Sequence, residues 1–449
     1  MADLSQPGDS RPDDPDEPNG PSIPGIPGFP AIPGLDFSNV DMSELFRILQ
    51  APGPVNWEIA TQIAMAVATE GDPGGPVAPS DETQLQELAR AAQTHVVAET
   101  GLAATFAAPV AAMSRREWAE LHLNALRPVL EALATTLGRA FSPEAMQGLL
   151  DEGLLEEGLV NLASPTDTPD GVPRPEELAA MMPMMAPLLL GVQSGSMIGY
   201  LARHALGRYD LPLPTADAPS LAFVVPNLDE FEEAWSLERA DLRFYVAIHE
   251  VVHAATRSVS WVRERLLALA TEYVSAYELD PTVLDSRLGD GVFENLDPSD
   301  PSSIQALAEH PEELLGALRS DRQRVLLERA RVFHAVLEGY ADTVLERVGR
   351  NLLPSFDRIH EAMARHRIER GEAERFVEGL LGLATDRDDY ERGAAFCSGV
   401  VERAGTDGLN RLWASPAMEP TSNELVAPGL WLARIDLDLD QDPEPGDAT

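Results

Sequence analysis

Two histidines and an acid lie together in the stretch "AIHEVVHAA", which matches the pattern H-E-x-x-H at His249, Glu250 and His253. On an α-helix, residues four apart share one face, so both imidazoles could reach the same metal ion. Glu250 would lie beside the ion and could take a proton from a metal-bound water. The pattern therefore predicts a zinc site with Glu250 as the general base.

A catalytic zinc site has three protein ligands and one open position, so a third ligand is needed. The segment "VFHAVLEGYADTV" has helical spacing and contains Glu338 and Asp342, four residues apart, among apolar neighbours. We predict that Glu338 is the third ligand, because a buried acid needs a cation, and that Asp342 accepts the second N–H of a ligating histidine. His334, on the same stripe, is the alternative ligand. His334 or Tyr340 could instead donate a hydrogen bond to the oxyanion.

Two other interpretations of the histidine pair stay open. The histidines could be packed core side chains of an amphipathic helix, which predicts a protein without zinc. They could also form a structural zinc site in a non-catalytic protein that binds a partner. A structural site is closed by four protein ligands, whereas we find three good candidates and no cysteine near them. The pattern therefore favours catalysis.

Composition narrows the class of protein. The chain has 449 residues, of which 44% are hydrophobic, so it can bury a sizeable core. It has 33 basic residues, all arginine, and 74 acidic residues, which gives a net charge of −41. Such a surface repels phosphate backbones, so we expect no nucleic-acid partner. Cys397 is the only cysteine, which excludes a disulfide framework and a thiolate-rich zinc cluster.

The N-terminus is acidic and rich in proline, unlike a signal peptide, so we expect a cytoplasmic protein. The segment Leu178–Ala202 has no charged residue and is long enough to span a membrane. Pro183 and Pro187 interrupt it, and polar residues dilute it. We therefore predict a buried helix and no membrane span, with Gly195 and Gly199 on one face allowing close packing.

Helical spacing dominates between the two ends of the chain. The strongest strand signal is the short apolar run "LAFVVPNL", Leu221 to Leu228. We expect it to form an edge strand beside the metal-binding helix, where an extended peptide could add to the sheet. The acidic segment 285–303 is expected to be a loop that covers the site.

Six stretches carry a resemblance to a known family: "GPVNWEIATQIA", "SGSMIGYLARHALGRYDLPLP", "VVPNL", "HEVVHAATRSVSWVRERL", "LEGYADTVLERVG" and "LNRLWASPAMEPTSNELVAPGLWLARI". On these, from roughly Gly53 to Arg434, the chain resembles zincin-like metalloproteases found mostly in actinobacteria, some associated with deazaflavin coenzyme biosynthesis. The resemblance implies a mostly helical zinc hydrolase. His249, His253 and Glu338 would be the zinc ligands, and Glu250 the general base.

These observations predict a mainly α-helical, zincin-like metalloprotease fold with a small β-sheet. We expect a disordered Pro/Gly-rich tail over residues 1–38, a helical N-terminal subdomain over 39–215, a catalytic subdomain over 216–435 and an acidic tail over 436–449. The predicted function is zinc-dependent cleavage of a peptide or amide bond in a peptide or protein substrate.

Overall fold

The computed structural model describes residues 52–70, 76–103, 110–140, 175–215, 217–278, 319–369 and 371–439. The Pro/Gly-rich tail, the acidic segment 285–303 and the last ten residues lie outside the described residues. The described elements, in chain order, are α2 (Trp57–Ala68), α3 (Pro79–Thr100), β1 (Ala111–Met113), α4 (Arg115–Ala125), α5 (Arg127–Ala140), α8 (Pro175–Ala202), β2 (Ala222–Val224), α9 (Val225–Trp235), α10 (Arg239–Ser258), α11 (Ser260–Ser275), α15 (Asp321–Leu352), α16 (Phe356–Ile368), α17 (Glu372–Leu381), α18 (Arg387–Asn410), the 3-10 turns η2 (Arg411–Trp413) and η3 (Pro416–Met418), α19 (Ser422–Val426) and α20 (Pro428–Leu439).

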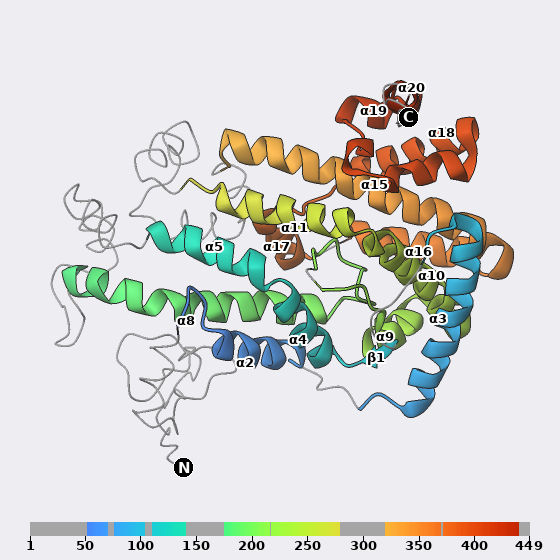
Figure 1. Cartoon of the computed structure of the whole chain (residues 1–449). Helices are drawn as coiled ribbons and strands as arrows, with labels where there is room; N and C mark the ends of the chain where they lie inside the picture. The colour runs from blue at the N-terminus through green and yellow to red at the C-terminus, as the bar shows by residue number, and fades with distance from the viewer. Residues whose placement is uncertain are drawn as a thin grey trace, which may run out of the picture.

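The fold is mainly α-helical with a small sheet, as predicted. Its helices pack around two large hydrophobic clusters. One cluster joins α3, α10, α15, α16 and α18, and the other joins α2, α4, α5 and α8 with parts of α11 and α17. In Figure 1, α2, α4, α5 and α8 lie together on one side and α15 and α18 on the other, with α10 and α11 between them. Helix α3 packs against α10, so hydrophobic contacts join the parts of the chain before and after residue 215. The division into two subdomains at residue 215 therefore stays a prediction.

Helices α8 and α2 approach closely through a row of glycines, as the sequence predicted for Gly195 and Gly199. A Cβ on Gly195 would lie 2.4 Å from the Ala60 carbonyl oxygen, and one on Gly199 would lie 2.6 Å from that of Ala64. The part of α8 from Met185 to Ala202 is long and apolar enough to cross a membrane by length and composition, and 56% of it is buried. The glycine contacts pack this segment against α2.

The apolar run after Leu221 forms a shorter strand than predicted. Strand β2 ends at Val224, and α9 begins at Val225 with Pro226 in its first turn, where its fixed φ suits a helix. Strand β2 pairs with β1 in parallel on one side. On its other side, Gly207 forms an antiparallel bridge with Phe223. The prediction of an edge strand open to a peptide is therefore wrong, because both sides of β2 are occupied.

The long helices α10 and α15 carry the predicted site. Helix α10 contains neither glycine nor proline and lies against α3 and α15. Helix α15 begins with a capping box, in which Ser320 and Gln323 satisfy each other's backbone N–H groups. It touches α18 backbone to backbone, since a Cβ on Gly339 would lie 2.3 Å from the Gly393 carbonyl oxygen. This contact fixes α15 at the residue next to Glu338.

Candidate metal centre

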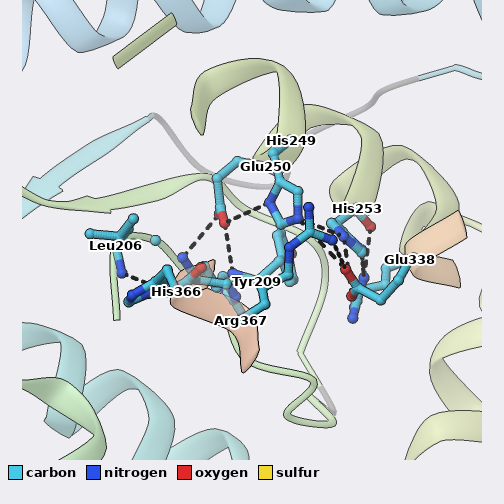
Figure 2. A network of polar contacts seen from close by, with 12 residues as sticks. Leu206, Tyr209, His249, Glu250, His253, Glu338, His366 and Arg367 are labelled. Atoms are coloured by element: carbon cyan, nitrogen blue, oxygen red, sulfur yellow. Dashed lines mark hydrogen bonds and ion pairs between the residues drawn. The ribbon is translucent and has the colours of Figure 1, made fainter. Parts of the chain in front are cut away.

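The two predicted histidines lie on the same face of α10 and point at a common position (Figure 2). Their Nε2 atoms are 3.1 Å apart, and their ring centroids are 4.4 Å apart. His249 is 4% exposed and His253 is fully buried. Burial is the main reason why the pKa of His253 falls to about 4, so its ring is neutral at pH 7. A neutral imidazole is the form that binds a metal.

Glu338 reaches the same position from α15. Its Oε1 atom is 3.5 Å from His253 Nε2, and its Oε2 atom is 3.9 Å from His249 Nε2. Burial opposes the charged form of this carboxyl group, but the two histidines outweigh burial and hold its pKa well below the usual value. Among the described residues, one ligand atom from each of these three side chains lies within 4.8 Å of the other two. The group is therefore the predicted His-His-Glu set.

This donor set fits a zinc ion. Zinc takes imidazole nitrogen and carboxylate oxygen, and two ligands of a tetrahedral ion at about 2.0–2.2 Å lie roughly 3.4 Å apart. The separations of 3.1, 3.5 and 3.9 Å scatter around that value. All three side chains are buried, which suits ligands that must exclude competing water. The site therefore needs little rearrangement to hold the ion.

Glu250 lies next to this group without belonging to it. Its Oε1 atom is 4.0 Å from Nδ1 of His249, whose other ring nitrogen, Nε2, faces His253. The backbone N–H groups of Arg208 and Tyr209 each donate to one carboxylate oxygen, both at 2.9 Å. Burial of the whole side chain raises the pKa of Glu250 to about 7. A base with a pKa near the working pH is suited to proton transfer at neutral pH.

The segment that holds Glu250 lies between α8 and β2. The Trp118 indole donates to the Gly207 carbonyl at 2.8 Å, and a His122 ring nitrogen lies 3.2 Å from the Arg208 carbonyl. The N–H of Arg208 points to the Glu250 carboxylate and the carbonyl of Arg208 points to His122. The backbone at Arg208 is therefore held by contacts on two sides. The carboxylate lies directly against Gly207, where a Cβ would come within 2.5 Å of Glu250 Cδ. The N-terminal helix α4 thereby positions an acid that belongs to α10.

The same segment carries a second buried acid. Asp210 accepts the Leu206 N–H at 3.0 Å and lies 3.2 Å from Nε2 of His366, which comes from α16. Burial opposes ionisation of Asp210, but the contact with His366 overcomes it and lowers the pKa of Asp210 to about 2. Figure 2 shows Leu206 and His366 beside Tyr209 and Glu250.

Within the described part of the chain, the hydrogen bonds of Asp342 are made with an arginine and not, as predicted from the sequence, with a ligating histidine. Arg367 of α16 donates to both of its carboxylate oxygens, at 2.7 and 3.2 Å. The same guanidinium lies 3.4 Å from Glu338 Oε2. Asp342 therefore influences the metal group indirectly, because it holds the arginine that contacts Glu338.

The outer nitrogen of His253 faces Arg257, one helical turn further along α10. The Arg257 Nη1 atom is 2.7 Å from His253 Nδ1. A guanidinium can only donate, so Nδ1 is the acceptor and the proton of the neutral ring is on Nε2. Arg257 is 1% exposed, and its guanidinium carbon lies 4.7 Å from the centre of the Tyr209 ring.

The other two predicted residues lie on α15 outside the converging group. His334 is buried one turn before Glu338 and contributes no atom to the three-ligand group within the described chain. The Tyr340 hydroxyl donates to Asn410 Oδ1 at 2.7 Å, and its ring packs edge-on against Trp413. Tyr340 thus joins α15 to the end of α18.

Sequence reasoning missed Arg257, Arg367 and the 206–210 segment. Arg257 is four residues after His253, so its place on the histidine face could have been read from the helical period. No sequence spacing relates Arg367 to Glu338, or the amides of Arg208 and Tyr209 to Glu250, because these contacts join distant elements.

Comparisons with known proteins identify the family of this chain. The family model "Zincin-like metallopeptidase" matches residues 55–432. A crystal structure described as "a putative hydrolase with a novel fold from Chloroflexus aurantiacus" superposes with a TM-score of 0.52 at 25% sequence identity, over 85% of this chain and 99% of that one. No curated protein matches. Because the family model covers most of the chain, including all three converging side chains, the protein belongs to the zincin-like metallopeptidase family.

Proposed function

We propose that this protein is a zinc-dependent metallopeptidase that cleaves a peptide or amide bond. The observation that carries the proposal is the convergence of His249, His253 and Glu338 from two helices, with Glu250 directly beside them. Family membership and the hydrolase neighbour support zinc hydrolysis in general. Peptide cleavage is the finer step and is our own proposal.

In this proposal His249, His253 and Glu338 hold the ion, which when bound supplies a Lewis acid and a water whose pKa is lowered to about 7. Glu250 takes up a proton and delivers it to the leaving amine. Each of its oxygens accepts one backbone N–H and retains a further lone pair for that proton. Because Arg208 and Tyr209 hold the carboxylate, its orientation needs no adjustment during the reaction.

The substrate would approach from the side of His249 and Glu338. These two side chains retain small exposed fractions, 4% and 8%, whereas His253 and Glu250 have none. The net charge of −41 disfavours anionic partners, so we propose a peptide or protein substrate and no nucleic acid. From the N-terminal sequence and the proline-interrupted apolar segment we also propose a cytoplasmic location without insertion in membranes. The family resemblance also implies a link to deazaflavin coenzyme biosynthesis, which stays a prediction.

The alternative function is a structural zinc site in a binding protein. Such a site is closed by a fourth protein ligand. Among the described residues the converging group has three members, and Glu250 is turned towards backbone amides. This arrangement supports catalysis over a structural role.

The proposal is tested by the zinc content of the full chain, purified without chelators, equilibrated with excess zinc and measured by elemental mass spectrometry against the same buffer without protein. We expect one zinc per chain in the wild type and none in His249→Ala or Glu338→Ala. His95→Ala, which changes an exposed histidine of α3, should retain the metal. A wild-type protein that binds no zinc even when zinc is supplied in excess would refute the proposal.

Activity is tested in a second step, by screening the zinc-loaded protein against a mixed peptide library. Glu250→Asp, which withdraws the carboxylate by one methylene, should retain zinc but lose cleavage. Zinc retained in Glu338→Ala would instead direct the search for the third ligand to His334. Zinc in the wild type with no cleavage of any peptide would favour the structural role.

A further inference from the structure

Arg257 is an unusual neighbour for a metal-binding histidine. In metal sites, the ring nitrogen that does not bind the ion almost always donates its N–H to a carboxylate, a backbone carbonyl or water. At His253 this place is taken by a guanidinium, whose Nη1 is 2.7 Å from Nδ1. Two donors cannot share a hydrogen bond, so the contact requires Nδ1 to be unprotonated.

The guanidinium is held firmly in this position. Arg257 is 1% exposed and lies over the Tyr209 ring, at 4.7 Å from its centre. Its Nη1 atom also lies 3.4 Å from the backbone carbonyl of His253. These contacts enclose the side chain on the helix that carries the ligand, so it cannot turn to solvent without leaving a buried space. A fixed positive charge therefore faces the metal group.

This contact opposes metal binding in two ways. In the neutral ring the proton is on Nε2, the ligand atom, which faces His249 Nε2 at 3.1 Å and Glu338 Oε1 at 3.5 Å. A metal ion must displace that proton while Arg257 still faces Nδ1. The cationic guanidinium also repels a second cation in a low-dielectric interior. Both effects lower the affinity of the site.

We propose that Arg257 is a positioning residue that keeps the zinc affinity of this site low by holding His253 with its proton on Nε2. The inference rests on the proposed zinc function and adds a regulatory property to it. Zinc occupancy, and with it activity, then follows the concentration of free zinc. A site with a carboxylate at this place would be loaded permanently.

The test is equilibrium competition for zinc between the full chain and a chromophoric chelator. Arg257→Met removes the charge and the donor but retains an unbranched chain that can pack on Tyr209. We expect it to bind zinc at least about tenfold more tightly than the wild type, the size typical of changes next to a metal ligand. Two controls should bind zinc as the wild type does. Arg257→Lys retains a cationic donor, and Arg322→Met removes a charge from the exposed face of α15.

A merely structural arginine predicts the opposite result. Equal or weaker zinc binding by Arg257→Met, in a protein with a wild-type circular dichroism spectrum, overturns the inference and leaves the proposed function intact. No zinc binding by the wild type would overturn the proposed function and this inference with it. If the wild type binds zinc but Arg257→Met does not fold, ¹⁵N NMR of the histidines in the metal-free wild type decides. With His253 assigned from the His253→Gln spectrum, a proton on Nε2 supports the inference and a proton on Nδ1 overturns it.

Discussion

Replacing Gly207 by alanine should separate catalysis from metal binding. A Cβ at this position would lie 2.5 Å from both Cδ and Oε1 of Glu250, and ordinary contact begins at 3.4 Å. The carboxylate or the 206–210 segment must therefore move by about 0.9 Å. Because the neighbouring amides of Arg208 and Tyr209 hold the carboxylate, such a shift also strains both hydrogen bonds.

The size of the effect follows from this displacement. Adding a methyl group to a packed interior lowers the free energy of unfolding by about 1–3 kcal/mol. Displacing a reacting group by about 1 Å can lower the rate roughly 100-fold. Glu250 is not a member of the converging group, so the zinc content of Gly207→Ala should equal that of the wild type.

The assay compares peptide hydrolysis, zinc content and urea unfolding in Gly207→Ala and Gly138→Ala. The control makes the same change in α5, where a Cβ meets nothing within 4 Å, and it should leave hydrolysis unchanged. Full activity in Gly207→Ala would refute the view that this segment positions Glu250 for catalysis. Loss of zinc would show that the segment acts through the metal ligands instead.

Two further predictions concern the support of Glu338. Asp342→Asn removes the charge that holds Arg367 and lets the guanidinium compete for the Glu338 carboxylate. Zinc affinity measured by chelator competition should therefore fall about tenfold. An unchanged affinity would contradict this role of Asp342. Gly393→Ala places a Cβ 1.9 Å from the Ala335 carbonyl oxygen and forces α15 and α18 apart; the free energy of unfolding in urea should fall by about 3 kcal/mol or more, and wild-type stability would show that the helices can separate freely.

Much of the site could be predicted because its two histidines lie close together in the sequence, on one helix. The relation between His249 and His253 depends only on the helical period, and α10 has a continuous apolar face without a breaking residue. The sequence predicts Glu338 as a ligand because a carboxylate among apolar residues needs a positive partner. The sequence leaves both Glu338 and His334 as candidates, whereas the packing of α15 on α10 places the Glu338 oxygens beside both Nε2 atoms.

The strand prediction shows the limit of such reasoning. An apolar run in "LAFVVPNL" indicates a buried segment, and Ala222–Val224 does form one. Periodicity carries no information about how many neighbours a strand has. The bridge from Gly207 covers the side that was expected to be open.

The amino-acid order alone indicated the candidate metal donors, their helices and the mainly α-helical class, because side-chain chemistry and the helical period are local properties. Tertiary packing specified the surroundings that control those donors. The amides of Arg208 and Tyr209 reach Glu250 across 42 and 41 residues of chain, and Arg367 reaches Glu338 across 29. Such contacts depend on how whole helices and the short sheet lie against one another, and no local spacing in the chain encodes that arrangement.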